Sequence, residues 1–115
     1  SNINGIDKTE TIITPGAFAI ILTLNESVNK INTLSRVKDS IATTRQYLPS
    51  DMNEPIAKLL DKSKSLIKLS ISSDILSRGE LTVVAKEVKS KLSKIQDISE
   101  VLIRGDSKEE VSIAI

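Results

Sequence analysis

The chain of 115 residues is long enough for one small domain, and its composition, 39% apolar and 27% charged, is that of a globular protein. Its net charge of +1 lacks the strongly basic character typical of nucleic-acid binding, so no nucleic-acid partner is expected. The absence of cysteine and histidine excludes disulfides, a thiolate nucleophile and the usual zinc ligands. We therefore expect no metal and no cofactor.

The first predicted element is a β-hairpin. Residues 10–14 and 17–24 are rich in β-branched and aliphatic side chains, and Pro15-Gly16 between them suits the centre of a type II turn. In the second strand, Phe18 begins a series of apolar side chains at every other position, which would share one face. An alternative interpretation makes Pro15 the first residue of a helix capped by Thr14.

An amphipathic helix is predicted next. Apolar residues recur at steps of three and four over residues 26–47, which predicts a helix there that ends before Pro49. Thr23 and Glu26 fit a capping box at its start, and Asn25 is an equally possible cap.

Residues 56–72 are ambiguous between helix and strand. Ile56, Leu59 and Leu60 are spaced as if along one side of a helix, whereas residues 67–71 alternate between apolar and polar side chains as in a strand. We predict a strand at the end of this segment and leave its beginning open.

A second amphipathic helix is predicted near residues 80–96, and its lysine-rich outer side is interpreted as solvated surface. Residues 100–105 and 110–115 flank a Gly-Asp-Ser-Lys turn, which predicts a C-terminal hairpin. Because the last strand stays apolar to its end, we expect the chain to be one stretch of a longer protein. The order of elements predicts an α+β fold of split β-α-β, ferredoxin-like units, with two main helices packed on a mixed or antiparallel sheet.

No arrangement of polar residues predicts catalysis. The nearest carboxylate pairs are Glu109 with Glu110 and Asp97 with Glu100, which we interpret as surface charges. No glycines lie close enough together for a phosphate-binding loop, and the many serines have no histidine partner. We therefore predict that the protein is not an enzyme.

Several short strings stand out along the chain. They are Asn4-Gly5-Ile6-Asp7, Leu48-Pro49-Ser50-Asp51-Met52, the serine-rich residues 61–65 before an apolar strand, and the patterns L-x-x-I, V-x-I-x-G and E-V-x-I-x-I within residues 92–115. In their order along nearly the whole chain, these strings resemble the porter region of resistance–nodulation–division (RND) efflux transporters.

The resemblance implies a setting and a function. RND pumps are proton-driven inner-membrane transporters of Gram-negative bacteria, and they work as homotrimers with a periplasmic adaptor and an outer-membrane channel. The chain would be a periplasmic portion of such a protein. Residues 1–60 would form the second half of one porter subdomain, and residues 61–115 the first half of the next. It would contribute to the path by which small amphiphilic molecules are exported.

The resemblance also implies where a substrate would pass. In the multidrug branch, aromatic residues on the crossing strand and before the glycine of the last hairpin line the drug pocket. The matching positions here are Leu66 or Ile67, and Arg104, and with Leu69 they form the candidate substrate path. A guanidinium favours carboxylate or phosphate groups, which departs from an aromatic pocket. The alternatives are core packing for Ile67 and Leu69, and a plain surface position for Arg104.

A different function remains open. The two strong amphipathic helices also suit a small, self-contained helical or α+β protein-interaction module. If the chain is part of a longer protein, missing neighbours would leave sheet edges open, and we then expect the isolated chain to self-associate.

Overall fold

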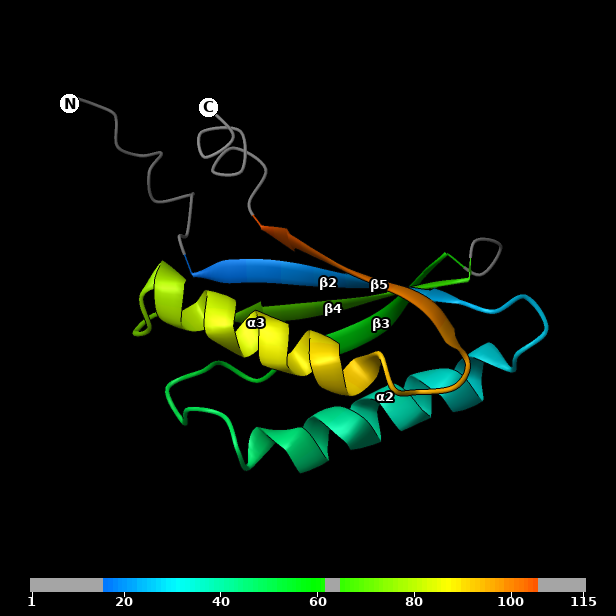
Figure 1. The fold of residues 1–115 in the computed structure, drawn as a ribbon, viewed down its shortest axis with the longest axis horizontal. Coiled ribbons are helices and arrows are strands. Elements are labelled where there is room, and N and C mark those ends of the chain that lie inside the picture. The colour runs from blue at the N-terminus through cyan, green and yellow to red at the C-terminus, as the bar shows by residue number, and fades with distance from the viewer. Residues whose placement is uncertain (1–15, 62–64, 106–115) are drawn as a thin grey trace, which may run out of the picture.

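The computed structural model describes residues 16–61 and 65–105 (Figure 1). Within these ranges the elements are β2 (Ala17–Leu24), α2 (Lys30–Arg45), β3 (Ile56–Asp61), β4 (Leu66–Ser72), α3 (Arg78–Leu92) and β5 (Ile98–Gly105). The predicted α+β class, with two helices packed on an antiparallel sheet, is confirmed. The strands predicted at residues 10–14 and 110–115 lie outside the described residues.

The four described strands form one antiparallel sheet in the order β3-β4-β2-β5. Along the chain this is a β-α-β-β-α-β arrangement, compatible with the ferredoxin-like split βαβ fold that the sequence predicted. The alternation predicted for β2 holds across the sheet, because Ile20 lies opposite Leu69 of β4 and Ile103 of β5. The rival interpretation of a helix over residues 17–24 is wrong.

Both helices cover the same face of the sheet (Figure 1), because their apolar stripes and the inward residues of the strands form one core. The buried members with less than 2% exposure include Ile20, Leu22, Val37, Ile67, Leu69, Ile71, Leu81 and Leu92. Neither α2 nor α3 has the length and apolar character needed to cross a membrane.

The first helix is confirmed, but its predicted cap is wrong. Asn29 caps α2, and its side chain accepts a hydrogen bond of 3.0 Å from the backbone N–H of Asn32. Thr23 belongs instead to β2, where it lies opposite Leu66 of β4. The backbone N–H of Asn25 donates to the carbonyl of Asp97 at 2.9 Å, so this segment is held by the sheet and the α3–β5 connection before the helix begins.

The ambiguous beginning of residues 56–72 is a strand, so β3 is one element more than the sequence predicted. It pairs with β4 at the edge of the sheet. The second helix is confirmed, and it begins earlier than predicted. Ser77 caps α3 in a reciprocal capping box with Glu80, a signal that the S-x-x-E spacing of the sequence already carries.

The division into porter subdomain halves after residue 60 stays a prediction. In the structure this division falls inside β3, between Leu60 and Asp61, and residues from both sides share the core.

Candidate functional site

The four residues proposed for a substrate path lie on opposite faces of the sheet. Ile67 and Leu69 are completely buried beneath the helices, opposite Leu22 and Ile20 of β2. They are core residues in this structure, which is the alternative that the sequence left open. Leu66 occupies an alternate position of the same strand and therefore points to the other face. Arg104 of β5 also points to this other face, because it is exposed and lies opposite Ala19, whereas Val101 of the same strand is buried.

We call this other side of the sheet, away from α2 and α3, the open face. Its residues are those that alternate with the core positions along each strand. They are Ala17, Ala19, Ile21 and Thr23 of β2, Leu66, Lys68, Ser70 and Ser72 of β4, Ile56 and Lys58 of β3, and Glu100, Leu102 and Arg104 of β5. Asp61 of β3 joins them after the register shift in that strand, because it lies opposite Leu66. No helix among the described residues covers this face (Figure 1).

The floor of the open face is built from small residues. Ala17, Ala19, Ser70 and Ser72 lie on the two central strands, and with Lys68 they line a shallow hollow of about 240 Å³. Because these side chains are short, the backbone of the two strands is approachable there. The hollow therefore offers weak, broad contact rather than an enclosed site.

The strand register arranges the open face in rows across the sheet. One row runs Lys58, Lys68, Ile21 and Leu102 from β3 to β5. The next row runs Ile56, Ser70, Ala19 and Arg104.

Leu66 and Arg104 are not brought together. They lie opposite Thr23 and Ala19, which are four positions apart on β2. Each of the two is therefore part of the open face, but the structure does not join them into one contact site.

Two lysines face each other on the open face. Lys58 of β3 lies directly opposite Lys68 of β4. Neither of them, nor Arg104, forms an ion pair with any residue in the described part of the chain. Like charges directly opposite one another destabilise a sheet. The sequence could not reveal this pair, because it depends on β3 being a strand and on its register.

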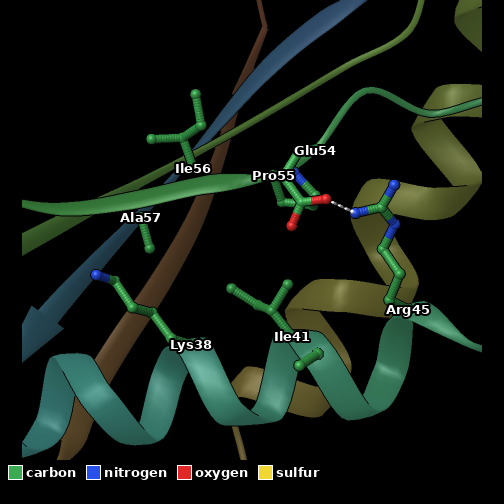
Figure 2. A pocket seen from close by; sticks show the side chains of 8 residues that line it. Lys38, Ile41, Arg45, Glu54, Pro55, Ile56 and Ala57 are labelled. Atoms are coloured by element: carbon green, nitrogen blue, oxygen red, sulfur yellow. Dashed lines mark hydrogen bonds and ion pairs between the residues drawn. The ribbon is translucent and has the colours of Figure 1, made fainter.

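A second hollow lies on the helix side of the sheet, between α2 and β3 (Figure 2). Its volume is about 490 Å³, and its apolar lining includes Ile41 and Ala57, which face each other across it. Lys38 borders it at one end. Arg45 borders the other end and is ion-paired with Glu54. The hollow lies beside β3, the outer strand of the described sheet.

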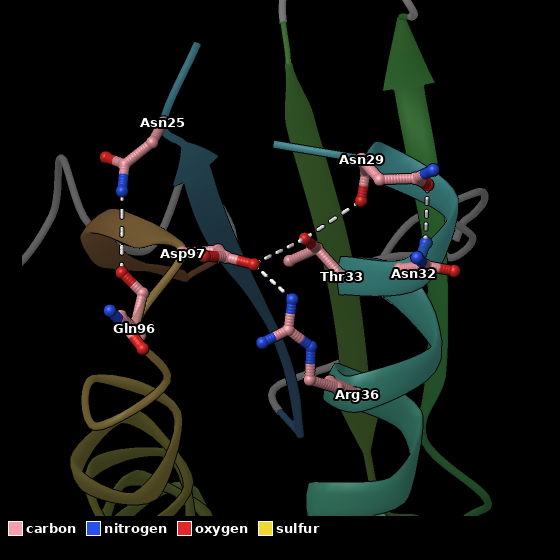
Figure 3. A network of polar contacts seen from close by, with 7 residues as sticks. All are labelled: Asn25, Asn29, Asn32, Thr33, Arg36, Gln96 and Asp97. Carbon is pink, nitrogen blue, oxygen red and sulfur yellow. Dashed lines mark hydrogen bonds and ion pairs between the residues drawn. The ribbon is translucent and has the colours of Figure 1, made fainter. Parts of the chain in front are cut away.

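A polar network joins the start of α2 to the α3–β5 connection (Figure 3). The carboxylate of Asp97 accepts a hydrogen bond from Arg36, and the hydroxyl of Thr33 lies 3.4 Å from Asp97 Oδ2 and 3.0 Å from the carbonyl oxygen of Asn29. Asn25 Nδ2 donates to the carbonyl of Gln96 at 3.4 Å. Asp97, predicted from the sequence to be a surface charge, thus holds two elements together. The Asp97 carboxylate accepts hydrogen bonds from Thr33 and Arg36 within the network, so its role is structural.

Ligands for a metal ion do not converge in the described ranges. No three acidic residues there are close enough to hold a metal ion, and the chain has neither histidine nor cysteine. No protein-family model matches the sequence, and no curated protein is significantly similar to it.

Proposed function

We propose that the chain is part of the periplasmic porter region of a proton-driven RND efflux transporter, and that its open face contributes to the path of small amphiphilic molecules. The observation that carries the proposal is the one-sided layer, in which both described helices pack on one face of a ferredoxin-like sheet and leave the other bare. Leu66 and Arg104, two positions that the RND resemblance implies for the substrate path, lie on the bare face.

The chemistry of the open face suits transient contact with an amphiphile. Ile21, Leu102 and Ile56 supply apolar surface, and Leu102 and Ile56 are 37% and 56% exposed. Burying such surface yields roughly 25 cal/mol per Å², so a ligand that covers part of the face is held weakly and can leave again. Lys58 and Lys68 add charge at one side of the face.

In this proposal the chain has no catalytic role, because a transport path moves a molecule without changing it. The homotrimer would provide the neighbouring subunits, and the periplasmic adaptor and outer-membrane channel would continue the path. The proton-driven step would take place in the membrane part of the inner-membrane protein, outside this chain.

The experiment is an export assay in the organism that carries the gene. Deleting the gene is expected to raise the accumulation of an amphiphilic fluorescent dye in the cells, and restoring it should reverse the effect. Ser70→Trp fills the hollow of the open face and should reduce export, whereas Ser90→Trp, on the exposed side of α3, should not. Equal accumulation with and without the gene, over a panel of dyes, would contradict the proposal.

The hollow beside β3 favours a second candidate, an α+β protein-interaction module. An extended segment of a partner that pairs with the outer edge of β3 would place alternate side chains near Ile41 and Ala57. The helical form of this alternative is wrong, because residues 17–24 and 66–72 are strands. Unchanged export after gene deletion, together with loss of partner binding in Ala57→Glu, would favour this candidate.

A further inference from the structure

We infer that the open face selects amphiphiles with an anionic headgroup, a carboxylate, sulfate or phosphate, and that Lys58 and Lys68 bind this headgroup. The inference rests on the proposed function and names the class of substrate that the path would take. It is carried by one row of the sheet, in which two cations are followed by two aliphatic side chains.

The lysine pair is the headgroup site. Residues directly opposite in an antiparallel sheet have Cβ atoms about 5 Å apart, so the two lysine side chains leave the sheet next to each other and both can reach one anion between them. Lys68 is half-buried on an inner strand and lines the hollow, whereas Lys58 is exposed on the outer strand. An anion placed between them adds two attractions that offset their mutual repulsion, so its binding is favoured beyond a single ion pair.

One acid lies near this pair, because Asp61, the last residue of β3, is opposite Leu66, two positions along β4 from Lys68. Glu100 is on β5, two strands from Lys68 and two positions beyond Leu102, which lies in the same row as Lys68. Strand spacing and rise place their backbones roughly 12 Å apart. That separation exceeds the screening length of about 8 Å at physiological salt. Arg104 lies two positions from Leu102 in the other direction, so Glu100 and Arg104 offset each other. The two lysines outnumber Asp61, so this side of the open face keeps a positive charge.

The apolar half of the row is the site for the tail. Ile21 follows Lys68 on the next strand, and Leu102 follows Ile21. Leu102 is two strand spacings from Lys68, so this apolar surface extends about 10 Å from the lysines. A headgroup at Lys58 and Lys68 therefore positions an alkyl chain of medium length across Ile21 and Leu102. A cationic amphiphile placed in the same way would meet repulsion, and a neutral one would gain only the apolar contact.

The test is a titration of the 115-residue chain with decanoate, decyl maltoside and decyltrimethylammonium, each below its micelle concentration, followed by NMR. Decanoate is expected to shift the amide resonances of Ile21, Lys68 and Leu102, and to bind at least several-fold more tightly than the other two compounds. Its preference should decline as salt is added, because exposed charges are screened.

Paired variants locate the effect. Lys58→Gln with Lys68→Gln should weaken decanoate binding roughly tenfold, since each exposed ion pair contributes a factor of up to about five. The matched control, Lys86→Gln with Lys94→Gln, removes the same charge from exposed positions in and just after α3 and should leave the affinity unchanged. Decyl maltoside should bind equally to all three proteins. The NMR spectra also report whether each variant is folded.

Three outcomes overturn the inference. Equal binding of the three decyl compounds would exclude charge selection, and equal loss of decanoate binding in the control variant would assign the effect to net charge alone. Absence of shifts on the open face would exclude the site. None of these outcomes decides the proposed function, whose failure is seen separately as unchanged dye accumulation after gene deletion.

Discussion

At the scale of single residues, neighbouring positions of β4 have opposite roles because successive side chains of a strand point to opposite faces. Ile67 is fully buried, whereas its neighbour Leu66 lies on the open face. The RND resemblance implies a pocket position at either residue, and under the proposed function Leu66 is the one on the face that a substrate would reach.

We predict that Ile67→Ala lowers the free energy of unfolding by about 2–5 kcal/mol, because it removes apolar contacts and leaves a cavity. The matched change Leu66→Ala should cost less than about 1 kcal/mol, as is usual for a position away from the core. Urea unfolding followed by circular dichroism measures both, since the chain has no tryptophan. If Ile67→Ala unfolds the chain, Ile67→Val is used instead, because it lowers the free energy of unfolding by a smaller amount. Equal losses at Leu66 and Ile67 would show that the face assignment is wrong.

The lysine pair gives a second prediction at this scale. Lys58→Glu should raise the free energy of unfolding by about 0.2–1 kcal/mol, because a repulsive cross-strand pair becomes an attractive one with Lys68. The control Lys38→Glu makes the same change in net charge on α2, where no charged residue lies three or four positions away. It should have no stabilising effect. A loss of stability in Lys58→Glu would contradict the register that places the two lysines opposite each other.

At the scale of elements, each helix begins at a residue whose side chain accepts a hydrogen bond from a free backbone N–H. Asn29 does this for α2 and Ser77 for α3, where Glu80 completes the capping box. The oxygens of Asn29 and Asp97 also fix the first turn of α2 against the connection to β5.

Removing the cap of α3 should destabilise the protein. We expect Ser77→Ala to lower the free energy of unfolding by about 1 kcal/mol, because the backbone N–H of Glu80 loses its acceptor. The control Ser90→Ala lies on the exposed side of the same helix and should be neutral or stabilising, since alanine has the higher helix propensity. Thermal unfolding of the two variants in parallel checks this, and an equal effect of both would argue against the cap.

The elements also show how far the sequence predicts this fold. The two helices, β2 and β4 follow from apolar periodicity within each segment, which is local information. The outer strand β3 could not be predicted from such periodicity, because its six residues form a strand by pairing with β4. The pairing contains a register shift between Leu59 and Asp61, and a slip of one residue would move Lys58 to the other face. Leu66 and Arg104 were therefore predictable as candidates, whereas the lysine pair was not.

At the scale of the whole molecule, the described sheet is covered on one face and has β3 and β5 as its outer strands. An outer strand presents backbone groups that can pair with another chain. A layer of this kind suits a part of a larger assembly, whose neighbours would cover the edges of the sheet.

We expect the isolated chain to self-associate through the edge at β3. Sedimentation velocity should show a mass that rises with concentration. Ile56→Lys should reduce this rise, because a charge on an outer strand opposes edge pairing. Ile31→Lys adds the same charge at an exposed position of α2 and should have little effect. A strictly monomeric chain at high concentration would contradict the expectation.

The central claim, that amphiphilic molecules contact the open face, is tested most directly by photo-crosslinking in cells. A photoreactive residue is placed at Ser70, in the hollow of the open face, or at Ser90, on the exposed side of α3, in the protein expressed from its own gene. Cells are supplied with an anionic amphiphile and irradiated, and adducts are identified by mass spectrometry. We predict that the amphiphile is captured at position 70 and not at position 90. Capture of polypeptide alone at position 70, with the amphiphile present, would contradict the claim and favour a protein-interaction surface.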